Sequence, residues 1–217
     1  PSIISKICNE NNLDQFIHIS ALGIDQAKDS KYAKSKLDGE QKIKENFEQA
    51  TILRPSVIYS VDDNFTTSFM TMLNLLPFFP LYYNGKTKFI PIHVSEVSDI
   101  ILHIIEKNIS SEIIECVGSQ EYSFKEILQK LLQLINKNKI LVPLPLMIGK
   151  IMARFLEMFP KPLLTLDQLK LLNYNNILSG KYKSNFDIGL DPKLKFEEEV
   201  AKYCHMWKDG GEYSKEI

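Results

Sequence analysis

What this sequence has little of narrows the class of protein. Its 217 residues include only three cysteines, Cys8, Cys116 and Cys204, which lie far apart in the chain. An odd, unclustered set of cysteines predicts reduced thiols in a cytosolic or matrix-type compartment, and no metal-spaced pair. The formal net charge is only -1, so the sequence predicts no electrostatic attraction to nucleic acid.

Long apolar runs and glycine-rich loops are also missing. No run reaches the roughly 18 apolar residues that a membrane-spanning helix needs, and the N-terminus lacks the basic start and apolar core of a signal peptide. No GxGxxG motif occurs anywhere in the chain. The chain begins with Pro1, and residues 1–11 read as the tail of a helix. We therefore expect that upstream sequence is missing.

The hydrophobic pattern predicts alternating helices and strands, which is typical of parallel α/β units. Ser30 and Ser123 are expected helix N-caps, the second in a capping box with Glu126, and Ser95 is expected to cap another helix. The expected strands are 15–20, which we interpret as buried, 50–54, 89–93 and 113–117. The expected helices are 2–11, 30–47, 95–107, 123–135, 147–159 and 196–207, the last with acidic residues in its first turn.

The helix expected at 147–159 carries three polar residues, Lys150, Arg154 and Glu157, in one stripe, and apolar residues cover much of the remainder. We favour packing of this helix on a domain core. Docking on a partner or on a membrane surface is the alternative.

The most informative motif is Tyr32-Ala33-Lys34-Ser35-Lys36. A Tyr followed four positions later by a Lys places both side chains on one helix face. The ammonium of Lys36 is then expected to lower the pKa of Tyr32 from its usual value of about 10. A tyrosine of that kind exchanges protons near neutral pH. On the pattern alone, the simpler explanation is an exposed turn of a Lys-rich helix.

Other polar residues receive less specific interpretations. We favour an exposed strand-end charge for Arg54 and a hydrogen-bonded core position for His18. His93 is either a structural hydrogen-bond donor, which we favour, or a residue of a substrate pocket. The adjacent carboxylates Asp62 and Asp63 indicate a loop or helix start rather than an acid/base pair.

Four segments together resemble the extended and atypical short-chain dehydrogenase/reductase family, in its order and at its spacing. The resemblance covers most of the chain. The segments are Phe16-Ile17-His18-Ile19-Ser20-Ala21-Leu22-Gly23, Tyr32-Ala33-Lys34-Ser35-Lys36, Leu53-Arg54-Pro55-Ser56-Val57-Ile58-Tyr59, and Phe89-Ile90-Pro91-Ile92-His93-Val94-Ser95-Glu96-Val97.

The resemblance implies a fold and a site. The fold is α/β, a Rossmann-type doubly wound parallel sheet that here lacks its first strands and its Gly-rich loop, with a smaller, mostly helical C-terminal region. Tyr32 is the implied general acid/base. Lys36 would lower the pKa of Tyr32 and bind the nicotinamide ribose. Ser20 would orient substrate or contact the cofactor, although the family's usual Ser or Thr aligns with Ala21 and Ser20 precedes it.

The implied cofactor is NAD or NADP, with backbone at Pro55, Ser56 and Val57 lining the nicotinamide face. The sequence does not choose between the two, because the family reads the ribose with a residue that would lie upstream of Pro1. No metal ligand set is implied.

Within the family, the chain resembles one branch in particular, the nucleotide-binding accessory subunit of respiratory complex I and its bacterial relatives. Val142-Pro143-Leu144-Pro145 with the helix after it, and Leu164-Thr165-Leu166-Asp167-Gln168, resemble that branch. The implied domains are 1–138, the later part of the nucleotide-binding domain with a substrate-loop insertion near 60–90, and 139–217, a mainly helical region.

Three functions stay open at this point. The first is an accessory or assembly subunit that holds a nicotinamide nucleotide, with complex I subunits as partners. Its place would be cytoplasmic, peripheral on the inner face of a bacterial inner membrane, or on the mitochondrial matrix side. The second is an active NAD(P)-dependent reductase, epimerase or dehydratase that uses Tyr32. The third is an α/β domain with a decayed site and no nucleotide.

Overall fold

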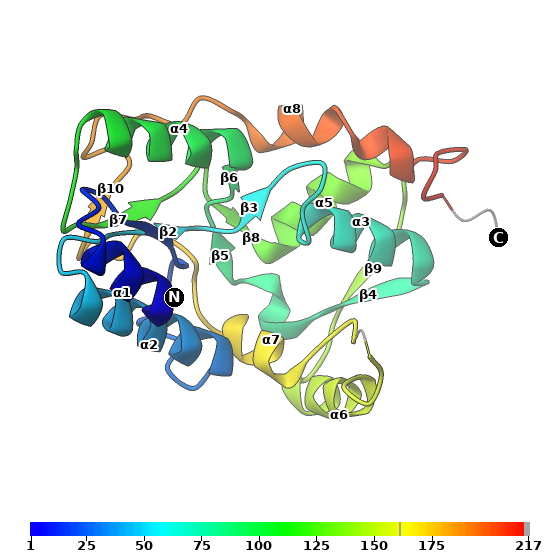
Figure 1. Cartoon of the computed structure of the whole chain (residues 1–217). Helices are drawn as coiled ribbons and strands as arrows, with labels where there is room; N and C mark the ends of the chain where they lie inside the picture. The colour runs from blue at the N-terminus through cyan, green and yellow to red at the C-terminus, as the bar shows by residue number, and fades with distance from the viewer. Residues whose placement is uncertain (161, 215–217) are drawn as a thin grey trace.

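A parallel sheet organises one half of the molecule (Figure 1). The structure, a computed structural model, describes residues 1–160 and 162–214. All neighbouring strands of this sheet pair in parallel, with Ile19 opposite Leu53 and Leu53 opposite Ile114. The α/β class predicted from the sequence is confirmed. In spatial order the strands are β1 (Ile17–Ile19), β2 (Thr51–Pro55), β7 (Ile113–Cys116) and β10 (Lys183–Ser184).

Helices cover both faces of this sheet. Figure 1 shows α1 (Ser2–Glu10) and α2 (Lys31–Asn46) on one face and α4 (Val94–Glu106) on the other. Apolar residues of α4 pack on Leu53 and Ile114 in one buried cluster. Because both faces are covered, β2 is buried along its whole length, as parallel strands usually are.

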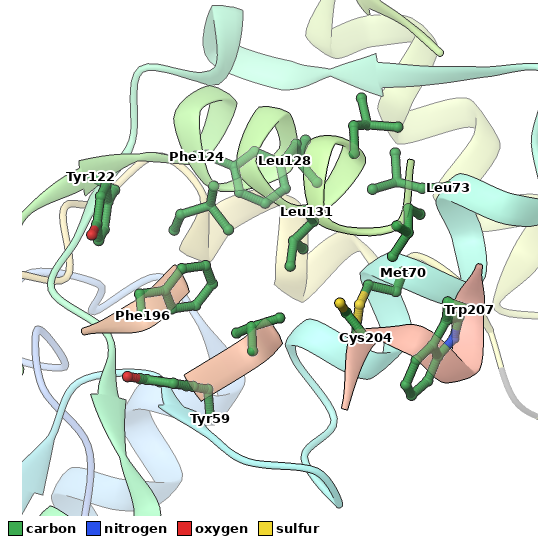
Figure 2. Close-up of a cluster of buried hydrophobic side chains, with 14 of the residues drawn as sticks. Tyr59, Met70, Leu73, Tyr122, Phe124, Leu128, Leu131, Phe196, Cys204 and Trp207 are labelled. Atoms are coloured by element: carbon green, nitrogen blue, oxygen red, sulfur yellow. The ribbon is translucent and has the colours of Figure 1, made fainter. Parts of the chain in front are cut away.

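The other half of the molecule has a separate aromatic core. Figure 2 shows side chains from α3 (Thr66–Leu75), α5 (Phe124–Leu134) and the segment from residue 196 to 207 meeting in one cluster. A parallel strand pair, β4 (Phe78–Leu81) and β9 (Ile140–Pro143), lies beside it. The tail forms α8 (Phe196–Ala201) and a 3-10 turn, η2 (Cys204–Trp207), rather than one helix.

The remaining elements are mostly short. They are β3 (Ile58–Tyr59), η1 (Tyr82–Gly85), β5 (Lys88–Phe89), β6 (Ile92–His93), β8 (Tyr122–Ser123), α6 (Leu146–Leu156) and α7 (Leu166–Leu171). β3 pairs with β6 and β5 pairs with β8. The chain also returns to the main sheet after residue 138, because β10 pairs with β7.

Two strand predictions need correction. Residues 89–93 do not form one strand of the sheet, because Pro91 has no N–H to continue a ladder. They divide between β5 and β6, each paired with a different short strand. The strand predicted at 15–20 is shorter, and it is partly exposed because β1 lies at the edge of the sheet.

Two of three predicted caps are confirmed. Ser30 caps α2, and Ser123 forms a capping box with Glu126. The third is wrong, because the Nδ1 atom of His93, not Ser95, accepts the free N–H at the start of α4.

The helix predicted at 147–159 packs on the body of the protein, as favoured, but through one narrow face, where Ala153 joins Tyr82 and Leu169 in a buried cluster. Gly149 and Ala153 are the buried residues of α6, whereas Met147, Ile151 and Phe155 are exposed. No helix in the described part of the chain is long and apolar enough to cross a membrane.

Candidate functional site

The predicted site residues gather where β1 and β2 end. The N–H of Ser20 donates to the Leu53 carbonyl at 2.7 Å, and the N–H of Leu22 donates to the Pro55 carbonyl at 2.9 Å. These bonds continue the β1–β2 ladder past the strand ends. The carboxyl edge of a parallel sheet is where open α/β folds bind ligands, so the location suits a binding site.

Helix α2 brings Tyr32 and Lys36 to this edge. The Nζ atom of Lys36 lies 5.8 Å from the centre of the Tyr32 ring. It also makes a long hydrogen bond, 3.5 Å, to the carbonyl of Ile19 at the end of β1. The structure therefore places the two residues on one helix face, as predicted.

The electrostatics of Tyr32 differ from the prediction. Tyr32 is 45% exposed, yet its partial burial raises the pKa of its phenol above the ordinary value. The ammonium of Lys36 lies over the ring and does not overcome this loss of solvation. The predicted lowering of the pKa is wrong for this arrangement, and the phenol holds its proton at neutral pH.

Ser20 supplies the most distinctive atom of the site. Its Oγ is buried and has no hydrogen-bond partner among the described residues. A buried hydroxyl left unpaired costs about 1–3 kcal/mol, so such atoms usually serve a ligand or an ordered water. Ala21, where the family's usual hydroxyl aligns, packs instead against the apolar cluster of Ile24 and Ala33. Of these two positions, the one that carries a hydroxyl is Ser20.

The backbone after β2 is held by a residue that sequence reasoning missed. Ser56 is buried, and its Oγ donates to the Oδ1 atom of Asn176 at 2.5 Å. The N–H of Val57 donates to the same oxygen at 3.2 Å, and Asn176 itself donates to the Leu22 carbonyl at 2.8 Å. Asn176 thus joins the loops after β1 and β2. It lies 120 positions from Ser56, so no local pattern signals it.

Arg54 is not the exposed charge predicted from the sequence. Its side chain is buried, because β2 is a central strand. It donates to both carboxylate oxygens of Glu40, at 2.9 and 2.6 Å, and to Asp25 at 2.7 Å. Its guanidinium also lies 4.7 Å from the ring centre of Tyr182. Burial disfavours the charge, but the two carboxylates outweigh it and raise the pKa of Arg54.

Asp167 fixes the start of the helix that carries Tyr32. Its carboxylate accepts hydrogen bonds from the Ser30 hydroxyl at 2.8 Å, the Lys31 N–H at 2.8 Å and the Tyr32 N–H at 3.0 Å. An anion is favourable at a helix N-terminus. Burial opposes ionisation, yet the bonds from Tyr32, Lys31 and Ser30 hold the pKa of Asp167 below its usual value.

Neither His93 nor His18 shares a hydrogen bond with Ser20, Tyr32 or Lys36 in the described part of the chain. His93 packs edge-on against Tyr59, 5.2 Å between ring centres, and its Nδ1 atom lies 2.7 Å from the Ser95 hydroxyl. This supports a structural role, although His93 accepts the Ser95 N–H where a donor was predicted. His18 is half-buried, and burial followed by the charge of Lys36 lowers its pKa.

Asp63 lies in the loop just before α3, as predicted for the carboxylate pair. Its Oδ1 atom accepts the N–H groups of Phe65 at 2.9 Å and Thr67 at 3.0 Å. Within residues 1–160 and 162–214, no group of three or more His, Cys, Asp or Glu side chains lies close enough together to hold a metal ion.

The parallel sheet with helices on both faces defines an α/β protein of the epimerase and dehydratase class. A family model described as the RmlD substrate binding domain matches residues 26–146. This is more than half of the chain, so the chain belongs to that family, which is RmlD-like within the NAD-dependent epimerases and dehydratases. The family resemblance stated from the sequence is confirmed.

More specifically, the chain is a distant homologue of a mitochondrial subunit. It is 25% identical over 192 residues to the NADH-ubiquinone oxidoreductase 40 kDa subunit of Neurospora crassa, covering 87% of this chain and 50% of that protein. It is 25% identical over 214 residues to the mouse NADH dehydrogenase [ubiquinone] 1 alpha subcomplex subunit 9, covering 95% of this chain and 56% of that protein. The chain thus spans about half the length of these relatives.

Solved structures agree on the fold. UDP-glucuronic acid 4-epimerase from Bacillus cereus in complex with NAD matches with a TM-score of 0.64 at 18% identity, over 94% of this chain and 65% of that one. The dTDP-glucose 4,6-dehydratase DesIV of Streptomyces venezuelae, with NAD and TYD bound, matches with a TM-score of 0.65 at 16% identity, over 95% of this chain and 63% of that one.

Proposed function

We propose that this chain forms the nicotinamide side of an NAD(P)-binding protein that serves as an accessory or assembly subunit of a respiratory complex I type. Its sheet is then the later part of a Rossmann-type nucleotide-binding domain. The observation that carries the proposal is the unpaired, buried hydroxyl of Ser20 beside Tyr32 and Lys36 at the carboxyl edge of the sheet.

The residues present fit such a nucleotide. Lys36 would donate to the nicotinamide ribose, Ser20 would satisfy its hydroxyl on the cofactor, and backbone at Pro55, Ser56 and Val57 would line the nicotinamide face. When bound, the cofactor supplies hydride exchange at its nicotinamide ring. The pyrophosphate needs a glycine-rich loop, which this chain does not contain, so Ser20 and Lys36 act on only one end of the nucleotide.

The raised pKa of Tyr32 favours a role in binding the nucleotide over a role in catalytic turnover. A phenol with a raised pKa stays protonated at neutral pH, which suits a steady hydrogen-bond donor. A general base instead needs a pKa close to the working pH. The distant relatives from Neurospora and mouse, named as subunits of an NADH-ubiquinone oxidoreductase, point the same way.

The second candidate is an active reductase, epimerase or dehydratase. The intact Tyr32–Lys36 pair on one helix face favours it. In that role, Tyr32 would donate a proton to a carbonyl oxygen of the substrate, or accept one from an alcohol. His93 is a weaker candidate for the substrate side, since its contacts are with Tyr59 and Ser95.

Partners and location follow from the accessory role. Complex I subunits would be the protein partners, and the protein would sit peripherally on the inner face of a bacterial inner membrane or on the mitochondrial matrix side.

Affinity purification of the complete tagged protein from mildly detergent-treated membranes tests the accessory role. Recovery of complex I subunits in constant ratio is the expected result. Recovery of the protein alone from the soluble fraction would overturn it. A Tyr32→Phe variant separates the two candidates: it should still co-purify with those subunits, whereas an enzyme should lose turnover roughly a hundred-fold or more.

A further inference from the structure

Helix α6 is built with its small residues inward and its large apolar residues outward. Gly149 and Ala153 are its buried positions. A Cβ atom placed on Gly149 would lie 2.4 Å from a ring carbon of Tyr82, so the glycine permits a very close approach to the body of the protein. Apart from Leu146, which packs beside Tyr82, most of the larger apolar side chains of α6 are exposed.

Those apolar side chains form a stripe at helical spacing. Met147, Ile151 and Phe155 follow one another at four-residue intervals, and the rings of Phe155 and Phe159 lie 5.7 Å apart. Ile151 is 65% exposed and Phe155 is 62% exposed. Met158 and Leu163 are exposed beside this stripe. Exposed apolar side chains that gather in this way mark an interaction surface rather than a chance exposure.

The charged residues of α6 itself have one sign. Lys150 and Arg154 are exposed on α6, four residues apart, and α6 contains no acidic residue. Neither cation forms an ion pair within the described part of the chain. The nearby carboxylate of Glu157 accepts the Leu166 N–H at 2.8 Å. The surface therefore combines an apolar stripe with positive charge, the pattern of a helix that lies in the headgroup layer.

From these features we infer that α6 docks on an anionic phospholipid surface, with its axis in the plane of the bilayer. Ile151 and Phe155 enter the boundary between headgroups and acyl chains, and Lys150 and Arg154 reach the phosphates above them. With 11 residues, α6 is too short to span a bilayer. This surface extends the peripheral location proposed above, and it requires neither the nucleotide nor a protein partner.

Vesicle flotation of the full chain tests the inference. Phosphatidylcholine vesicles with phosphatidylglycerol are compared with phosphatidylcholine vesicles alone, without nucleotide. The wild-type chain should float with the anionic vesicles, and added salt should weaken its binding. An Ile151→Ser/Phe155→Ser variant should bind at least about tenfold more weakly, because two apolar side chains no longer leave water.

A matched control comes from α4. Leu102 and Ile105 are 56% and 51% exposed, so a Leu102→Ser/Ile105→Ser variant removes similar apolar surface elsewhere and should float like the wild type. A Lys150→Gln/Arg154→Gln variant should lose binding mainly on the anionic vesicles. All these positions are exposed, and circular dichroism checks that each variant is folded.

A spectroscopic probe gives an independent readout. A Phe155→Trp variant should show a blue shift of emission when anionic vesicles are added, whereas a Leu102→Trp variant should not. The native Trp207 is buried and serves as a constant background.

Three outcomes would overturn the inference: no flotation of the folded wild type, equal flotation of the wild type and the Ile151→Ser/Phe155→Ser variant, or a stripe that instead joins two copies in solution. Failure here is distinct from failure of the accessory role, because co-purification with complex I subunits is measured separately.

Discussion

Tyr32 has geometry suited to catalysis and electrostatics suited to binding. The lysine four positions along lies over its ring, while partial burial keeps the phenol protonated. Spacing in the sequence therefore predicts which side chains meet, but it does not predict the pKa that results. The pKa depends on how much solvent the rest of the fold removes.

The raised pKa leads to a direct prediction. Ultraviolet difference titration of the wild type against Tyr32→Phe should show that Tyr32 ionises above its usual value of about 10. If turnover needs the phenolate, activity should rise with pH and reach no plateau near neutrality. Ionisation of Tyr32 below pH 9 would contradict this account. Tyr213, which is exposed, supplies a Phe control.

At the scale of the secondary-structure elements, a buried ion pair joins α2 to β2. Arg54 of β2 donates bidentate hydrogen bonds to the carboxylate of Glu40 on α2. The same guanidinium also donates to Asp25, in the loop after β1. The network fixes the distance between the helix that carries Tyr32 and the strand that leads to Ser56.

Loss of one carboxylate should be costly. A Glu40→Gln variant leaves the buried guanidinium with only Asp25, and breaking a buried pair costs about 3–5 kcal/mol. We expect a fall in the free energy of unfolding at the lower end of that range, measured by urea denaturation. Glu45→Gln, an exposed change on the same helix, should cost less than about 0.5 kcal/mol. A Glu40→Gln effect no larger than that of the control would refute the role of the network.

Local sequence patterns predicted much of the fold but few of the contacts between residues far apart in the sequence. Helix starts at Ser30 and Ser123 follow from nearby residues, and so does the parallel class of the sheet. Three features had no local signal: Asn176 between two loops, Asp167 at the start of α2, and the burial of Arg54. Each depends on a partner or neighbouring strand brought close only by folding. Hydrophobicity likewise did not predict that α6 packs through Gly149 and Ala153, because the pattern cannot tell which face is covered.

At the scale of the whole molecule, residues 167–174 form hydrogen bonds with residues 29–32. Asp167 lies 137 positions from Ser30, yet its carboxylate binds the start of α2. Nearby, Lys170 donates to the Asp29 carbonyl at 3.0 Å, and the Tyr174 hydroxyl donates to the Asp29 carboxylate at 2.9 Å. The site is therefore assembled from segments at both ends of the chain.

This contact should give the stability a defined pH dependence. The pKa of Asp167 is lower in the folded state, so its stabilisation is complete above the unfolded pKa of about 3.9 and is lost as pH falls through the folded value. At pH 7, Asp167→Asn should lower the free energy of unfolding by about 1 kcal/mol, the scale of a helix-cap contact. The difference should vanish in acid. A difference that persists at pH 2 would contradict it, and Asp191→Asn provides a control.

The contact between Asp167 and the start of α2 is also linked by hydrogen bonds to α6. Glu157, at the end of α6, accepts the first N–H of α7, and the next residue of α7, Asp167, grips the backbone of Tyr32. Two hydrogen-bonded contacts thus lie between α6 and Tyr32. The membrane-facing surface inferred for α6 and the backbone of Tyr32 are therefore linked through α7 by two side chains, those of Glu157 and Asp167, that lie close together in the sequence.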